Sequence, residues 1–310
     1  MALISNRTPF DLDLGLKGTH VLVTGGCGMI GKHVAHAFLA AGSKVSIIDL
    51  VTDDQCPFDQ SDKNVLYQRG DITDVQAMDN MFAASERAFG TVEVCVALAS
   101  LDLSVLEQTE SLADMDPKVW QRTFDVNING TFMTCQRWLR SIRKAASSPE
   151  SAAELRNVSL IIMGSESGRF GVRTMAAYAA GKSAVQYGLM YSLALDAPRI
   201  FPRARVNAIA PGAVETERFK VESKEFGAEW RWRECEATYV YFECTEMTIA
   251  DKYSVPMAKP IPPEDVARTI LFLASERYSG SVHGQLIPID AGKGGNLVWT
   301  QDELKRRGGT

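Results

Sequence analysis

Short β-branched runs that alternate with helical patterns constrain the fold of this chain more than any other feature of the sequence. The helical patterns lie near residues 30–41, 74–88, 117–144, 175–196 and 263–275. The expected strands between them are His20–Thr24, Lys44–Asp49, Val65–Arg69, Val92–Ala97, Val158–Met163, Arg205–Ala210 and Gln285–Ile289. Apolar strands separated by helices predict right-handed βαβ units and a parallel sheet covered on both faces. We therefore expect an α/β protein with a single Rossmann-type, doubly wound parallel sheet of about seven strands.

We expect one dinucleotide-binding catalytic domain over residues 1–310, because no repeat, low-complexity tract or linker divides the chain. Two segments interrupt the alternation. Arg143–Arg156 is polar and contains a proline, which predicts an exposed helix extension or loop. Gly212–Pro263 is a long excursion before the last strand, and it contains the aromatic residues Phe219, Phe226, Trp230, Trp232, Tyr239, Tyr241, Phe242 and Tyr253.

Composition and charge exclude several classes of partner. The net charge is −5 and neither half carries a basic run, so nucleic acid has no electrostatic footprint to bind. No run approaches the ~18 apolar residues of a membrane span, and the N-terminus lacks the pattern of a secretory signal. We expect a protein of the cytoplasm that binds a small-molecule substrate and contacts neither membrane nor nucleic acid.

The cysteines and histidines predict no metal site. The cysteines at 27, 56, 95, 135, 235 and 244 contain no CxxC pair and fall mostly in apolar segments, which favours reduced core residues. His33 and His36 are three residues apart, but no cysteine or acidic residue accompanies them at ligand spacing. We expect both histidines on the outer face of the first helix.

A glycine-rich loop follows the first strand directly. Gly26, Gly28 and Gly31 have the spacing GxGxxG, and a helix begins immediately afterwards. Glycine permits the tight turn and lets backbone N–H groups approach a pyrophosphate at the helix N-terminus. The strand before the loop, the helix after it and an acid about 20 residues further on together predict a dinucleotide site.

That acid is Asp49, which ends the second strand. A carboxylate there accepts hydrogen bonds from the adenosine ribose hydroxyls and repels a 2′-phosphate. No arginine or lysine follows in the next few positions, so the sequence favours NAD over NADP. Asp71 and Ile72 follow the third strand, where the adenine ring is expected to lie.

A serine, a tyrosine and a lysine that follow the fifth strand form a candidate catalytic group. Tyr178 lies thirteen residues after Ser165, and Lys182 lies four residues after Tyr178 on the same helix face. Tyrosine is a poor base at neutral pH, because its ordinary pKa is ~10. An adjacent ammonium favours the phenolate, so Lys182 is expected to activate Tyr178.

With these motifs in order, residues 18–292 resemble the short-chain dehydrogenase/reductase family. The resemblance also includes Asn127 within DVNING, the stretch RVNAIAPGAVET from Arg205 to Thr216, and the closing Gly284–Gln285. It implies that Tyr178 is the general acid/base, that Ser165 hydrogen-bonds the substrate oxygen and that Asn127 anchors a water in a proton relay. Lys182 is implied to hold the nicotinamide ribose and tune Tyr178. The further cofactor contacts that it implies are Thr24, Gly25, Met29, Ile30, Ala97, Pro211, Gly212, Val214 and Thr216.

Two departures concern the branch of the family. The loop Gly25-x-x-Gly28-x-x-Gly31 is typical of the extended branch, and Ala97–Ser100 replaces the usual Asn-Asn-Ala-Gly. The length of 310 residues and the Pro-Gly segment with Thr216 are typical of the compact branch. We interpret the chain as a compact-type enzyme with an atypical cofactor loop.

The leading hypothesis is hydride transfer between NAD(H) and a secondary alcohol or ketone, in a homo-oligomer (dimer or tetramer). The resemblance implies that residues 213–260 form a substrate-lid insertion, whose aromatics favour a bulky apolar or ring-containing substrate. The same aromatics equally fit packing onto the body or into a subunit contact. Two other functions stay open: an NAD-retaining epimerase, dehydratase or cyclase, and a non-catalytic NAD-binding sensor or scaffold.

Overall fold

The computed structural model describes residues 12–102, 105–106, 109, 111–172, 175–216, 256–257 and 261–293. In this part of the chain seven parallel strands form one sheet in the order β3-β2-β1-β4-β5-β6-β7. The strands are β1 (His20–Thr24), β2 (Lys44–Asp49), β3 (Val65–Arg69), β4 (Val94–Ala97), β5 (Ser159–Met163), β6 (Arg205–Pro211) and β7 (Leu286–Ile289). The predicted α/β class and sheet are confirmed, with strand ends within two residues of their expected places.

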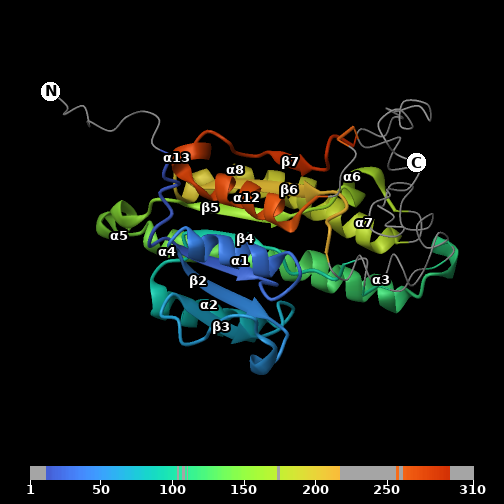
Figure 1. Cartoon of the computed structure of the whole chain (residues 1–310), viewed down its shortest axis with the longest axis horizontal. Helices are drawn as coiled ribbons and strands as arrows, with labels where there is room; N and C mark the ends of the chain where they lie inside the picture. Colours follow the sequence, from blue (N-terminus) through green and yellow to red (C-terminus); the bar gives the residue numbers. More distant parts are fainter. Residues whose placement is uncertain are drawn as a thin grey trace, which may run out of the picture.

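Helices cover both faces of the sheet (Figure 1). On one face α1 (Gly31–Ala40) packs beside α12 (Pro263–Ala274), which is followed by the short α13 (Glu276–Ser279). The other face carries α2 (Val75–Phe89), α4 (Thr131–Ala145) and α8 (Met190–Ile200). The other helices among the described residues are α3 (Pro117–Phe124), α5 (Pro149–Glu154), α6 (Ser167–Phe170) and α7 (Ala176–Ser183), with 3₁₀ turns at Asp53–Gln55 and Leu112–Asp114.

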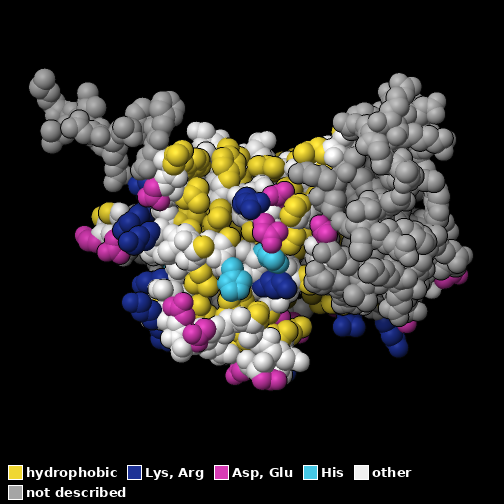
Figure 2. Space-filling view, viewed as in Figure 1, with side chains coloured by type: hydrophobic (Ala, Val, Ile, Leu, Met, Phe, Trp, Pro, Cys, Tyr) yellow, Lys and Arg dark blue, Asp and Glu magenta, His cyan; other side chains and the backbone are white. Residues whose placement is uncertain are grey.

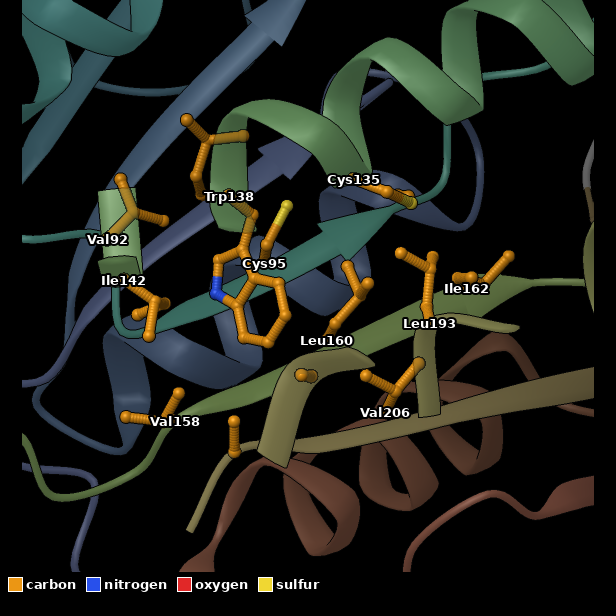
Figure 3. Close-up of a cluster of buried hydrophobic side chains, with 14 of the residues drawn as sticks. Val92, Cys95, Cys135, Trp138, Ile142, Val158, Leu160, Ile162, Leu193 and Val206 are labelled. Atoms are coloured by element: carbon orange, nitrogen blue, oxygen red, sulfur yellow. The ribbon is translucent and has the colours of Figure 1, made fainter. Parts of the chain in front are cut away.

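Alternation along each strand divides the core into two layers. Leu22 of β1 belongs to the layer under α2, α4 and α8, whereas Val21 and Val23 belong to the layer under α1 and α12. The fully buried indole of Trp138 fills the first layer, among side chains of β4, β5 and α4 (Figure 3). Burial on both faces explains why the strands are continuous apolar runs.

Two of the predicted helices contain a π-helical turn. The stretch expected at 117–144 is α3, the π-turn η3 (Asp125–Gly130) and α4, and that expected at 175–196 is α7, the π-turn η4 (Ala184–Leu189) and α8. Helix α8 continues through Pro198 to Ile200. The proline has no N–H for the Ala194 carbonyl, and His283 Nε2 lies 2.7 Å from that oxygen instead.

The Arg143–Arg156 segment and the two histidines of the first helix lie where the sequence predicts them. The Arg143–Arg156 segment holds the end of α4 and the mostly exposed α5. His36 is exposed on α1 and His33 pairs with Glu264 of α12 at 3.1 Å; Figure 2 shows histidine side chains on this face of the molecule. In the described part of the chain no group of three or more potential ligands could hold a metal, and Cys27, Cys56, Cys95 and Cys135 are free thiols.

Most of the predicted lid, residues 213–260, lies outside the described residues, as do all eight aromatics and the cysteines at 235 and 244. Its first residues, Ala213–Thr216, are described, and Val214 forms a parallel bridge with Ile261. The single-domain prediction for 1–310 remains a prediction. Among the described helices, none has the length and hydropathy that crossing a membrane requires.

Candidate active site

A cleft of about 470 Å³ lies at the carboxyl ends of the strands. Parallel α/β sheets bind ligands at this edge, where the strand order reverses between β1 and β4. Most of the predicted site residues line the cleft: Gly25, Gly28, Met29, Ile30, Asp49, Asp71, Ile72, Ser165, Tyr178, Lys182, Pro211, Gly212, Val214 and Thr216. Thr24, Gly26, Gly31, Ala97 and Asn127 are not part of its lining. The fold therefore brings most of the predicted site residues to one cleft.

The loop between β1 and α1 requires its glycines. Gly25 has a φ of +70°, and its N–H donates to the Ile48 carbonyl at 2.8 Å. A Cβ on Gly31 would collide with the Gly25 carbonyl oxygen and lie 2.8 Å from the Gly26 Cα, while one on Gly26 would lie 2.8 Å from Ile47 Cγ2. The chain folds back on itself too closely for side chains, which leaves the loop N–H groups at the start of α1 near the cleft.

Asp49 joins the end of β2 to this loop. Its Oδ2 accepts the Cys27 N–H at 2.8 Å, and its Oδ1 accepts the Leu50 N–H at 2.7 Å. Leu50 lines the cleft too and is 62% exposed. The carboxylate thus has a fixed position on the cleft wall, where a ribose hydroxyl could reach it.

Ser165, Tyr178 and Lys182 all line the cleft. Ser165 follows β5, its N–H donates to Gln186 Oε1 at 2.8 Å, and its Oγ accepts the Ser167 N–H at 3.1 Å. Tyr178 is 7% exposed and packs against Val172 and Met175. The Lys182 Nζ lies 5.6 Å from the centroid of the Tyr178 ring. The i, i+4 spacing on α7 therefore brings a phenol and an ammonium together, in a cleft that Ser165 also lines.

Lys182 is a buried cation with fixed partners. Its Nζ donates to the Met163 carbonyl at 3.0 Å and to Ser100 Oγ at 3.1 Å. Burial lowers the pKa of Lys182 to about 8, and the Asp102 carboxylate opposes that shift. With this pKa the side chain is mostly protonated at neutral pH, so the cleft carries a positive charge next to Tyr178.

Asn127 supports the loop that follows β4. Its Oδ1 accepts the Leu101 N–H at 2.7 Å and its Nδ2 donates to the Leu101 carbonyl at 2.9 Å. The backbone carbonyl of Asn127 accepts the Thr131 hydroxyl at 2.8 Å. The Asn127 side chain is buried and belongs to η3. Its amide therefore holds the loop after β4 in place and is not part of the cleft surface.

Three contacts of this site are not evident from the sequence motifs. One is the hydrogen bond from Lys182 Nζ to Ser100 Oγ. The sequence signal for it is Ala97–Ser100, which stands in place of the usual Asn-Asn-Ala-Gly stretch. A second is the hydrogen bond from the Ser165 N–H to Gln186 Oε1. The third is the 3.1 Å ion pair between Glu166, which lines the cleft, and Lys293; the two side chains are 12% and 11% exposed. Burial raises the pKa of the Glu166 carboxyl, and Lys293 opposes that shift.

The sequence profile of the short chain dehydrogenases matches residues 19–226. The chain belongs to this family. Members are oxidoreductases that bind a nicotinamide cofactor, and the glycine loop, Asp49 and the buried lysine of this cleft fit such a group. The chain is 28% identical over 276 residues to 3-oxoacyl-acyl-carrier-protein reductase MabA of Mycobacterium tuberculosis, covering 88% of this chain and 92% of the relative.

Other short-chain dehydrogenases are similarly related. Fluoren-9-ol dehydrogenase of Terrabacter sp. is 28% identical, covering 93% of this chain and 77% of the relative. Galactitol 2-dehydrogenase of Agrobacterium fabrum is 28% identical over 89% of this chain and 98% of its own. The crystal structure of gox2181 has a TM-score of 0.72 at 24% identity, covering 90% of this chain and 97% of that one, which shows the shared fold.

Proposed function

We propose that this short-chain dehydrogenase transfers a hydride between NAD(H) and a secondary alcohol or ketone, with Ser165, Tyr178 and Lys182 as its catalytic residues. The observation that carries the proposal is that all three side chains line one cleft, with Lys182 Nζ 5.6 Å from the centroid of the Tyr178 ring. The cofactor, when bound, supplies or accepts the hydride. The protein's own task is to hold the substrate oxygen and to move its proton.

The Tyr178 hydroxyl is the proposed proton donor and acceptor for that oxygen, and Ser165 Oγ hydrogen-bonds the same atom. A cation beside a phenol favours the phenolate, and the Lys182 ammonium provides this cation. Asn127 is proposed to support proton relay by fixing the loop after β4 and the backbone of η3. In alcohol oxidation Tyr178 takes the proton, and in ketone reduction it gives the proton.

The glycine loop and Asp49 are proposed to select NAD. The rigid carboxylate on the cleft wall would accept from ribose hydroxyls and repel a 2′-phosphate. Further cofactor contacts are assigned to the cleft-lining residues Met29, Ile30, Asp71, Ile72, Pro211, Gly212, Val214 and Thr216, and to Thr24 and Ala97 at the strand ends behind them.

The substrate is proposed to be bulky and ring-containing. The names of two relatives support this: fluoren-9-ol dehydrogenase and 2,3-dihydro-2,3-dihydroxybenzoate dehydrogenase of Bacillus subtilis, which is 25% identical over 90% of this chain. A panel of cyclic and open-chain secondary alcohols with NAD⁺ tests the proposal by NADH absorbance. Sustained absorbance supports net oxidation, whereas product without NADH indicates an NAD-retaining isomerisation or elimination. Cofactor binding without any product would point to a sensor.

A homo-oligomer is proposed for the working protein. Phe132 of α4 and Tyr191 and Leu195 of α8 are 45%, 49% and 76% exposed, and Tyr187 and Tyr191 lie 6.3 Å apart between ring centroids. Large exposed apolar side chains on neighbouring helices fit a subunit contact. Light scattering coupled to gel filtration tests this, and a monomer at micromolar concentration would contradict it. The free thiols of the described residues fit the expected location in the cytoplasm.

A further inference from the structure

Ser100 occupies a rigidly held position on the cleft wall. On one side of it, Thr24 Oγ1 accepts the Leu98 and Ala99 N–H groups at 3.2 and 3.4 Å. On the other side, the Asn127 amide makes its two hydrogen bonds to the Leu101 backbone. Ser100 is thus the single residue between two clamps, and the loop can hold its hydroxyl in one place.

The hydroxyl lies 3.1 Å from Lys182 Nζ, where it accepts one of the ammonium's hydrogen bonds. An ammonium has three N–H donors. The Met163 carbonyl and Ser100 use two of them, which leaves one N–H for a group that enters the cleft. Because Lys182 is only 3% exposed, bulk water offers no ready replacement for either acceptor.

Burial favours the neutral amine, and any acceptor of its hydrogen bonds favours the ammonium. The charged groups that line the same cleft are Asp49, Asp71, Asp102, Arg122 and Glu166, and Glu166 pairs with Lys293 behind it; the Tyr178 phenol on α7 lines the cleft too. Of these, Asp102 raises the pKa of Lys182. Ser100 and the Met163 carbonyl are neutral acceptors that act in the same direction, and of the two only Ser100 acts through its side chain.

We propose that Ser100 is a positioning residue that holds the Lys182 ammonium charged and aims its remaining N–H at the cleft. For catalysis the inference rests on the proposed function, in which that ammonium holds the cofactor ribose and acts on Tyr178. The contact itself requires neither cofactor nor substrate. It can therefore be tested on the free protein.

The test is a pH titration of Lys182 by NMR in the full, cofactor-free chain labelled with ¹³C-lysine, with the resonance assigned by Lys182→Met. Removing an acceptor from a buried ammonium should lower the proton affinity of Lys182 about tenfold in Ser100→Ala. Ser100→Thr keeps the hydroxyl and should titrate like the wild type. Ser43→Ala is the matched control. It removes a buried hydroxyl that donates to the Leu16 carbonyl at 3.0 Å, just before β2 and at the edge of the sheet opposite the cleft.

A Lys182 titration that is the same in Ser100→Ala and wild type would overturn the inference. If the Ala variant does not fold, Ser100→Gly removes the same hydroxyl and gives the same reading. With a verified alcohol, the alkaline limb of kcat/KM should move to lower pH in Ser100→Ala and stay in place in Ser100→Thr. A shifted titration in a chain without dehydrogenase activity would refute the proposed function and leave the Ser100 contact established.

Discussion

The Tyr178 ring packs against apolar side chains, so the ring of a phenylalanine can take its place. It packs against Val172, Met175 and the half-buried Leu106. Tyr178→Phe should leave thermal stability and NAD binding nearly unchanged and reduce turnover by about 10²–10⁴-fold, the usual contribution of a general acid–base group. Initial rates and cofactor titrations measure the two effects. Tyr191→Phe on α8 is the control, and near-normal turnover in the Tyr178 variant would refute the mechanism.

Asp49 offers a second test at the residue scale, because its charge and its hydrogen bond can be separated. Asp49→Asn removes the charge but keeps an oxygen that can accept the Cys27 N–H. We expect the preference for NAD over NADP to narrow roughly tenfold, equivalent to about 1.4 kcal/mol. Adding Leu50→Arg should reverse the preference, since Leu50 is exposed on the cleft and a guanidinium grips phosphate bidentately. Fluorescence titration measures the affinities for NAD and NADP. A wild type that binds NADP more tightly would contradict the assignment.

At the scale of elements, alanine substitution should have very different effects at Gly31, next to the loop between β1 and α1, and at Gly188 in η4. Gly31→Ala places a methyl group against the Gly25 carbonyl and the Gly26 backbone, so the loop must move. We expect cofactor affinity to fall at least tenfold, equivalent to about 1.4 kcal/mol. Gly188→Ala in η4 meets no atom within 4 Å and should be neutral or stabilise by up to about 1 kcal/mol. Calorimetric binding and thermal unfolding measure both variants, and equal behaviour of the two would contradict this view of the loop.

The same elements show what the sequence could predict. Strands and helices were found because each carries its own periodic signal, and Tyr178 and Lys182 share a helix face that spacing alone reveals. The π-turns were missed, because one extra residue within a helix barely changes an apolar pattern. The Ser100–Lys182 and Glu166–Lys293 contacts join residues 82 and 127 positions apart, and only the packed fold brings such pairs together.

For the whole molecule, His20 predicts how stability depends on pH. It is buried between β1, β2 and the end of α2; its Nδ1 donates to the Gly90 carbonyl at 2.8 Å and its Nε2 accepts the Ser46 hydroxyl at 2.9 Å. Burial lowers the pKa of His20 to about 4 from an ordinary value of 6.5. Between these values the unfolded chain binds a proton that the folded chain does not, so stability falls as the pH falls.

The loss should reach about 3 kcal/mol at pH 4 and begin below pH 6.5. Urea unfolding at pH 7.5, 6, 5 and 4 measures it. His20→Gln should remove this part of the slope, although its stability at pH 7.5 will be lower. His36→Gln, which changes an exposed ring on α1, should keep the whole slope. An identical slope in the His20 variant would show that other groups cause the acid sensitivity.

Each of the two π-turns joins two α-helical segments and offsets the rotation of one segment about the helix axis from that of the other. A π-turn closes its hydrogen bonds one residue later than an α-turn, and one residue corresponds to about 100° of rotation. In η4 the offset lies between α7, which carries Tyr178 and Lys182, and α8, whose Leu193 and Ala197 face the sheet. The half with Tyr178 and Lys182 and the half that packs on the sheet can therefore diverge independently over evolution, since repacking α8 does not require α7 to turn away from the cleft.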